Sequence, residues 1–188
     1  FCLRFILSVK IIIKGKENII INKKFFIAAS HQSMFETFYL QTVFNSPVFI
    51  LKKELLKIPI FGWYLKKIGS ISINRNKASK DNLGFFEDIL KIVNSSNRPL
   101  IIFPQGTRVL PDERPSFKKG ATRIYQKLNI ACQPVAINSG YVWPKNGSKK
   151  SHRTITISIL EPIKNGLDAR EFLKLLEDKI YSELNEIN

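Results

Sequence analysis

Short apolar runs alternate along this chain with longer segments in which apolar residues recur every three or four positions. Continuous or alternating apolar runs predict strands at residues 24–30, 47–51, 70–74, 100–103, 132–137 and 154–160. Helical spacing predicts helices at residues 33–44, 54–67, 79–93 and 116–128. This alternation is typical of an α/β fold with a mostly parallel central sheet flanked by helices.

The last segment of the chain predicts a further helix. Asp168 is followed three residues later by Glu171, a pattern typical of a helix start. An apolar stripe then repeats at helical spacing, formed by Phe172, Leu176, Ile180, Leu184 and Ile187. We therefore expect a C-terminal helix over residues 168–188. The total of 188 residues predicts a single domain, residues 1–188.

Residues 1–13 come nearest to a membrane-spanning segment, but Arg4 and Lys10 interrupt them and no uncharged apolar run reaches 18 residues. This segment is compatible with the inner end of a membrane helix, an interfacial helix or a first strand. We therefore treat residues 1–19 as a membrane-proximal candidate. The first residue is Phe rather than Met, so we expect an upstream segment, and with it an N-terminal anchor, to be missing here.

The composition is that of a globular protein with an excess of positive charge. Hydrophobic residues make up 44% and charged residues 24% of the chain, which excludes a disordered chain, a collagen and a coiled-coil rod. There are 30 Lys and Arg residues against 15 Asp and Glu, a net charge of +15. Such a surface predicts an anionic partner, for which nucleic acid, anionic lipid and phosphorylated substrates all qualify.

A first group of candidate catalytic residues follows the strand predicted at 24–30. His31 lies where the chain turns toward the next helix, and Glu36 follows five residues later. If His31 lies in that turn, Glu36 can reach back to one ring nitrogen and leave the other to act as a general base. The alternative is structural, because Ser33 and Glu36 also have the spacing of a helix-capping box.

A second group follows the strand at 100–103, where the sequence reads Phe-Pro-Gln-Gly-Thr-Arg over residues 103–108. Gly106 allows close approach of the backbone to a ligand, and Arg108 offers a planar fork that suits phosphate. Arg75 follows the strand at 70–74 in the same way. The alternative is an ordinary turn with a solvated arginine. Together the two groups predict a site that holds a phosphate and deprotonates a hydroxyl.

Other catalytic chemistries find less support in the sequence. No Gly-x-Ser-x-Gly elbow exists, which disfavours a serine nucleophile. His31 and His152 lie far apart without a Cys/His cluster, so we expect no metal site. Cys132 lies in an apolar run, and we interpret it as a core residue.

In order along the chain, these blocks resemble the glycerolipid acyltransferases, the family of 1-acyl-glycerol-3-phosphate acyltransferases. His31-x4-Glu36 resembles the H-x4-D motif, residues 69–75 the second block, and residues 103–108 the third block, F-P-E-G-T-R. Residues 133–136, Gln-Pro-Val-Ala, resemble the fourth block. The stretch that begins at Lys52 is similar to a Lys-x-x-Leu…Pro…Gly segment of the family. The resemblance covers about residues 20–165.

The resemblance implies an acyltransferase-like fold and a role for each matched residue. His31 would be the catalytic base and Glu36 its acidic partner. The acceptor phosphate would be bound by Arg75, Arg108, Gly106, Thr107 and Lys52. The loop and acceptor site would include Gln105, Ser33 and Pro134.

The activity implied by the resemblance is acyl transfer to the sn-2 hydroxyl of 1-acyl-glycerol-3-phosphate, giving phosphatidic acid. The co-substrate would be acyl-CoA or acyl carrier protein, with no cofactor. Two residues depart from the family pattern, Glu36 in place of Asp and Gln105 in place of Glu. Glu36 can still hold an imidazole. Gln105 keeps one acceptor oxygen but loses the charge, so activity survives only if hydrogen bonding is what the loop needs.

Residues 47–67 interleave aromatic and aliphatic side chains with five lysines, the composition of an interfacial element. The alternative is that many of these apolar residues pack under the sheet. Residues 1–67 hold 11 Lys and Arg against 3 acidic residues. We expect an anionic membrane surface as partner, at the cytoplasmic face of the cell membrane, with the protein peripheral or anchored by the missing N-terminal segment.

Three other functions stay open at this point. The first is a lysophospholipid acyltransferase with a different acceptor, such as an ornithine-lipid precursor. The second is an inactive homologue, suggested by Gln105. The third is a basic protein that binds nucleic acid or a membrane surface. We expect no nucleic-acid partner, because the basic residues are dispersed and no nucleic-acid-binding signature is present.

Overall fold

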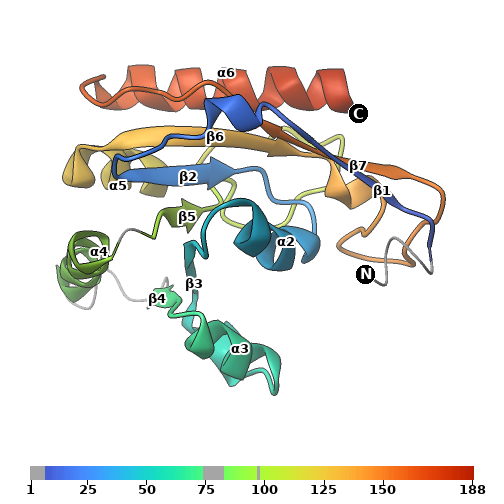
Figure 1. Ribbon diagram of the computed structural model, residues 1–188, viewed down its shortest axis with the longest axis horizontal. Coiled ribbons are helices and arrows are strands. Elements are labelled where there is room, and N and C mark those ends of the chain that lie inside the picture. The colour runs from blue at the N-terminus through green and yellow to red at the C-terminus, as the bar shows by residue number, and fades with distance from the viewer. Residues whose placement is uncertain (1–6, 74–82, 97) are drawn as a thin grey trace.

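The computed structural model describes residues 7–73, 83–96 and 98–188, which fold into an α/β structure around one sheet (Figure 1). Its seven strands lie in the order β1-β7-β6-β2-β5-β3-β4. The five strands from β6 to β4 are parallel to one another, β7 is antiparallel to β6, and β1 is parallel to β7. The predicted mostly parallel sheet is therefore confirmed. The strands are β1 Lys10–Lys14, β2 Phe25–Ala29, β3 Val48–Lys52, β4 Ile71–Ile73, β5 Leu100–Ile102, β6 Ala131–Ile137 and β7 Thr154–Ile159.

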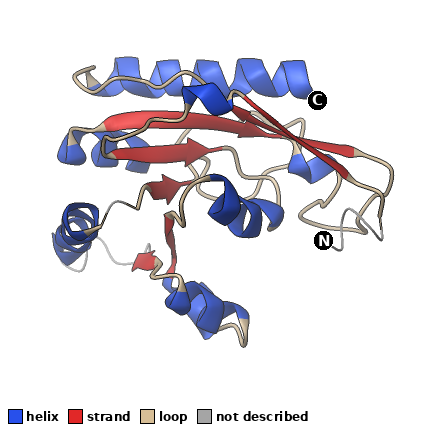
Figure 2. Cartoon of the chain, viewed as in Figure 1, coloured by secondary structure: helices blue, strands red, loops and turns tan. Residues whose placement is uncertain are grey.

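Helices cover both faces of the sheet (Figure 2). Residues of α4, α5 and α6 pack on one face, and residues of α2 and α3 pack on the other. The side chains of β2 show why two layers form, since Phe26 and Ala28 point to the first face and Ile27 and Ala29 to the second. The helices are α2 Phe35–Val43, α3 Phe61–Lys67, α4 Leu83–Ser95, α5 Gly120–Leu128 and α6 Ala169–Ile187, with 3-10 turns η1 Lys16–Asn18, η2 Lys53–Lys57 and η3 Ser139–Tyr141.

The predicted helix at residues 54–67 is wrong as a single element. The structure has the 3-10 turn η2 and the short helix α3 there, separated by residues 58–60. Pro59 disfavours helical backbone at the preceding residue, and Ile60 adopts a positive φ of 63°. An apolar pattern with helical spacing therefore spans a break that the backbone imposes.

The structure confirms a strand near the N-terminal end of the sequence and the predicted helix at the C-terminal end. Of the three alternatives for residues 1–13, the strand is confirmed over residues 10–14 as β1, and residues 1–6 lie outside the described part. At the other end, the Asp168 carboxylate accepts hydrogen bonds from the backbone N–H groups of Arg170 and Glu171, which lowers its pKa. The predicted apolar stripe of α6 is buried at Phe172, Leu176, Ile180 and Leu184.

The crossover connections locate a cleft at the carboxyl edge of the sheet. After β2 the chain crosses by α2 on one face, whereas after the neighbouring β5 it crosses by α5 on the opposite face. Ligands of open α/β sheets bind where adjacent strands diverge in this way. The same divergence occurs between β5 and β3, which continues through α3.

Cys132 is wholly buried in β6, and burial raises the pKa of its thiol, as befits the predicted core residue. Within the described ranges, the helices are all too short or too polar to traverse a bilayer.

Candidate active site

His31 and Glu36 meet at the carboxyl end of β2. The strand ends at Ala29, His31 lies in the turn that follows, and Glu36 lies in the first turn of α2. The His31 Nδ1 atom is 3.0 Å from Oε2 of Glu36. The structure therefore brings these two predicted residues together in the arrangement that general-base chemistry requires.

The Glu36 carboxylate is wholly buried and surrounded by donors. It accepts hydrogen bonds from the backbone N–H groups of Gln32 and Ser33 at 3.0–3.1 Å, and from the hydroxyl of Ser139. Burial of a carboxylate is tolerated only when such partners replace water. The capping alternative also holds in part, since Glu36 bonds to the Ser33 N–H and the Ser33 hydroxyl accepts from the Phe35 N–H. Glu36 therefore helps to cap the N-terminus of α2 and also orients the imidazole of His31.

This pairing sets the tautomer of His31. A carboxylate can only accept, so the Nδ1 atom carries the hydrogen and Nε2 keeps its lone pair. Among the described residues, Nε2 has no hydrogen-bond partner. The ring stacks on Phe103, with centroids 3.9 Å apart and planes 15° apart, and 17% of the side chain is exposed. The imidazole is therefore held on two sides with one nitrogen available for a substrate proton.

The loop after β5 holds the backbone of His31. Oε1 of Gln105 accepts a hydrogen bond from the His31 N–H at 2.6 Å, and the Val109 N–H donates to the His31 carbonyl at 2.9 Å. Gly106 has a φ of 78°, a conformation that favours glycine. Gln105 is 2% exposed, and its side chain also interacts with the Tyr181 hydroxyl of α6. Gln105 therefore contacts both the backbone of His31, through its oxygen, and Tyr181.

Helix α6 supports the far side of the same loop. The Glu177 carboxylate accepts from the Phe117 N–H at 2.7 Å, and the Tyr181 hydroxyl donates to the Pro115 carbonyl. Burial raises the pKa of Tyr181 to about 12. The loop between β5 and α5 is thus fastened at one end to His31 and at the other to the C-terminal helix.

Basic side chains share a small cavity with His31. This cavity of about 230 Å³ is lined by His31 together with Lys52, Gly106, Thr107 and Arg108. Among the described residues, neither Lys52 nor Arg108 has an ion-pair partner. Two unpaired cations beside a histidine form a suitable site for a phosphate whose neighbouring hydroxyl reaches Nε2.

Two other predicted site residues, Ser33 and Pro134, lie away from this cavity. Arg75 lies outside the described residues. Ser33 is wholly buried at the start of α2 and does not line the cavity, so its place supports the capping interpretation rather than an acceptor role. Pro134 is buried in β6 opposite Ala28 and lines neither this cavity nor the larger one described next. The strand order separates it from the cavity, because β2 lies between β6 and β5.

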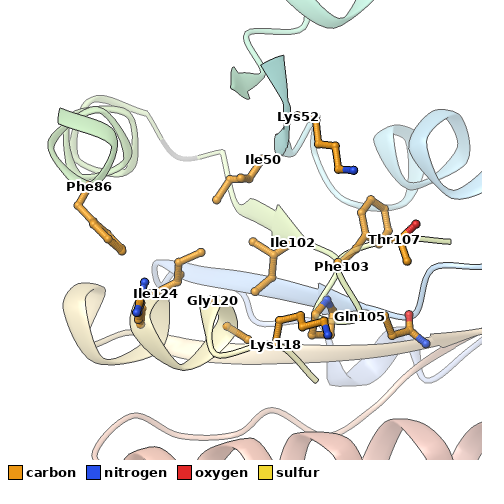
Figure 3. A pocket seen from close by; sticks show the side chains of 14 residues that line it. Ile50, Lys52, Phe86, Ile102, Phe103, Gln105, Thr107, Lys118, Gly120 and Ile124 are labelled. Carbon is orange, nitrogen blue, oxygen red and sulfur yellow. The ribbon is translucent and has the colours of Figure 1, made fainter. Parts of the chain in front are cut away.

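A larger, mostly apolar cavity of about 530 Å³ lies on the other side of the same loop (Figure 3). It opens between β3, β5 and the start of α5. It shares five lining residues with the smaller cavity, namely Ile50, Lys52, Phe103, Gly106 and Thr107. Three basic residues, Lys52, Lys118 and Arg123, line it. Its apolar walls come from Ile50, Phe86, Ile102, Ala121 and Ile124. The space suits an aliphatic chain whose polar end reaches the His31 side of the loop.

Sequence reasoning missed Ser139, the residue that supports Glu36 from η3. Ser139 is wholly buried and 103 positions away from Glu36 along the chain. Beside it, the Gly140 N–H donates to Oε1 of Gln32 at 3.0 Å. A Cβ at Gly140 would lie 2.9 Å from the Gln32 side chain and from Pro111, so no larger residue fits. The signal available was position, since Ser139 directly follows β6 as His31 follows β2.

The fold and this site define an α/β acyltransferase. A family model described as Acyltransferase matches residues 10–138, and the chain belongs to that family. The resemblance inferred from the motif blocks is thereby confirmed.

Relatives with an established name agree with the family. The chain is 33% identical over 159 residues to the 1-acyl-sn-glycerol-3-phosphate acyltransferase of Pseudomonas aeruginosa, covering 83% of this chain and 60% of that protein. It is 28% identical over 194 residues to the enzyme of the same name from Saccharomyces cerevisiae, covering 98% and 63%. The chain thus spans about three fifths of the length of these curated relatives.

A solved structure shows the same architecture. The crystal structure of the 1-acyl-sn-glycerophosphate (LPA) acyltransferase PlsC from Thermotoga maritima matches with a TM-score of 0.79 and 26% sequence identity. The match covers 96% of this chain and 73% of that one. The predicted single α/β acyltransferase fold is therefore confirmed.

Proposed function

We propose that this protein transfers a fatty acyl group from acyl-CoA or acyl carrier protein to the sn-2 hydroxyl of 1-acyl-glycerol-3-phosphate. The product is phosphatidic acid, a precursor in phospholipid biosynthesis. The observation that carries the proposal is the His31–Glu36 contact of 3.0 Å beside a cavity lined by Lys52 and Arg108. The names of the relatives support the choice of acceptor.

The reaction follows from the tautomer of His31. The sn-2 hydroxyl gives its proton to Nε2, and its oxygen attacks the carbonyl carbon of the thioester to form a tetrahedral intermediate. The new C–O bond stays, the C–S bond breaks, and the imidazolium returns its proton to the departing sulfur. Glu36 stabilises the imidazolium between these two transfers. The chemistry requires the acyl thioester as co-substrate and no further cofactor.

The acceptor phosphate fits the basic end of the small cavity. Arg108 provides a planar pair of donors and Lys52 a point charge, on the same cavity wall as Thr107 and Gly106. By resemblance to the second block, Arg75 joins them. In this arrangement the phosphate is bound by cations while the sn-2 hydroxyl faces His31.

The acyl chain of the donor fits the larger cavity. Its apolar walls would cover the hydrocarbon, and the shared residue Phe103 would bring the thioester to the His31 ring that it stacks on. The cavity of about 530 Å³ is of the size of small-ligand sites in proteins.

Both the acceptor and the product are bilayer lipids, whereas acyl-CoA and acyl carrier protein are water-soluble. A protein that joins them has to work at a membrane surface that faces the cytoplasm. The net charge of +15 supports an anionic surface as the partner. We therefore place the protein at the cytoplasmic face of the cell membrane.

The test is transfer by the purified protein, supplied with 1-acyl-glycerol-3-phosphate and either acyl-CoA or acyl carrier protein. Formation of phosphatidic acid is followed by mass spectrometry. His31→Asn should lower turnover by a factor of about 10² to 10⁴, the usual effect of losing a general base. His152→Asn is the matched control, because His152 is exposed. Equal turnover by His31→Asn and the unchanged protein would refute the proposal.

A further inference from the structure

We infer that residues 53–67, which form η2 and α3, are the surface by which this protein docks on an anionic lipid bilayer. The inference rests on the proposed function, because it assigns the membrane that supplies the acceptor to one face of the molecule. Figure 1 shows α3 at the end of the molecule away from α6, below the sheet edge formed by β3 and β4.

Large apolar side chains are exposed together on this segment. Ile60 is 85% exposed and Trp63 is 65% exposed, and Ile58 is exposed as well. Phe38 of α2 adds a fourth exposed side chain, and its ring lies 5.9 Å from that of Phe61 and 5.4 Å from that of Tyr64. These contacts place the exposed Phe38 of α2 against α3. Contiguous apolar surface of this kind marks an interaction site.

The backbone is strained at Ile60, the most exposed of these residues. Ile60 adopts φ 63° and ψ −55°, a region that β-branched residues rarely enter. The backbone of Gly62 packs closely against that of Leu56, since a Cβ at Gly62 would lie 2.2 Å from the Leu56 carbonyl oxygen. A strained turn that presents isoleucine to water is costly for a protein that meets only solvent. The same turn is suited to inserting Ile58 and Ile60 below lipid headgroups.

The charges around the patch are almost all positive. Four lysines of the segment are exposed, and the only acidic residue within 53–67 is Glu54. The Lys67 ammonium lies 4.9 Å from the centre of the Trp63 ring, which places a cation and an interfacial aromatic side by side. The lysines are Lys53, Lys57, Lys66 and Lys67. Exposed lysines in the same segment as exposed apolar side chains are complementary to anionic lipid and not to a neutral or basic partner.

The inner side of the same segment faces the candidate active site. Leu55, Phe61 and Leu65 line the cavity of about 230 Å³ that also contains His31 and Arg108. The segment 53–67 therefore lines the cavity with some of its side chains and exposes other apolar side chains to solvent. Docking by this surface would place the cavity at headgroup depth, where the phosphate of the acceptor lies.

The first experiment measures where Trp63 goes. In a Trp143→Phe background, Trp63 is the remaining tryptophan, since the chain has two. Vesicles of phosphatidylcholine with phosphatidylglycerol should shift its emission to the blue, and brominated acyl chains should quench it. Vesicles of phosphatidylcholine alone should do so more weakly. Emission that stays unshifted and unquenched while the protein sediments with the anionic vesicles would overturn the inference.

The second experiment uses matched variants in vesicle sedimentation. Ile60→Asn combined with Trp63→Ser should lower the partition coefficient at least about tenfold, because two side chains no longer enter the bilayer. Asn adopts a positive φ more readily than most residues, and circular dichroism checks that the variant keeps its fold. Ile21→Asn is the control, since Ile21 is 73% exposed in the segment between η1 and β2. Loss of binding by the control rather than by the double variant would refute the assignment.

A third measurement separates this inference from the proposed function. With a short-chain acceptor dissolved as monomers, the double variant should turn over like the unchanged protein, because neither residue lines a cavity. With acceptor presented in anionic vesicles, its turnover should fall with its binding. If no acceptor supports turnover, the proposed function fails, and the sedimentation result still decides the docking surface.

Discussion

The hydroxyl of Ser139 donates a hydrogen bond to the same Glu36 carboxylate whose other oxygen lies 3.0 Å from Nδ1 of His31. Ser139 and Glu36 are both wholly buried, so water cannot replace either partner. The orientation of the candidate base therefore depends on a residue from η3, on the other side of β2 from the loop that holds the phosphate-binding candidates.

Replacing Ser139 by Ala should weaken both stability and turnover. The buried carboxylate loses one donor, which costs about 1–3 kcal/mol of unfolding free energy. Because Glu36 is then less firmly held, kcat should fall about tenfold with little change in KM. Urea denaturation and steady-state kinetics measure the two effects.

Ser158→Ala is the matched control for that change. Ser158 is also buried and donates to a carboxylate, that of Glu183, at 2.5 Å, but it faces α6 away from His31. It should lose stability and keep its kcat. A fall in kcat of the same size in both variants would show that Ser139 acts through general stability alone.

Replacing Gln105 distinguishes a need for an oxygen from a need for charge. Gln105→Glu keeps the acceptor for the His31 N–H, so turnover should change less than about threefold. Gln105→Leu removes the acceptor and should lower kcat/KM by about 10- to 100-fold, equivalent to about 1–3 kcal/mol. A large gain of rate in Gln105→Glu would instead mean that the natural glutamine is a defect.

Arg108→Ala should act on acceptor binding more than on chemistry. Loss of a charge-assisted contact to phosphate should raise KM for 1-acyl-glycerol-3-phosphate at least about tenfold. The KM for the acyl donor should stay within about twofold, because the proposed acyl cavity does not include Arg108. Arg153→Ala serves as the control, since Arg153 is exposed and lines neither cavity. An unchanged acceptor KM in Arg108→Ala would remove this residue from the phosphate site.

The cap of α6 predicts a pH dependence of stability. The backbone donors of Glu171 and Arg170 hold the pKa of Asp168 below its ordinary value of 3.8. A carboxyl group with a lowered folded pKa stabilises the fold above its unfolded pKa and loses that effect as pH falls through the folded value. Asp168→Ala should therefore lower Tm at neutral pH, and the difference should shrink as pH falls below 3.8. A constant difference in Tm across this range would contradict the cap as its cause.

The pattern of apolar and polar residues predicted most of the strands and helices, and it also predicted the pairing of His31 with Glu36. The apolar run of β2 places His31 in a turn, and the spacing to Glu36 then brings the two together. The helix predicted at 54–67 failed because periodicity does not record that Pro59 and Ile60 break the backbone.

Contacts between distant segments could not be predicted in the same way. Ser139 and Pro134 both belong to the stretch around β6, yet only Ser139 approaches Glu36. The position of Ser139 after a strand marks it as a candidate, but which residue approaches Glu36 depends on strand order and register, which local pattern does not give. Gln105 was recognised as a departure from the family, but its bond to the His31 backbone appears only in three dimensions.

The pairing of β1 with β7 has a consequence for how this protein is made. Lys10 pairs with Thr154, so β1 has to wait for 144 further residues before its partner leaves the ribosome. Closing so long a loop is slow relative to local pairing. During that interval Ile11, Ile12 and Ile13 remain uncovered in the nascent chain, and a chaperone or the translocation machinery has its best opportunity to bind them.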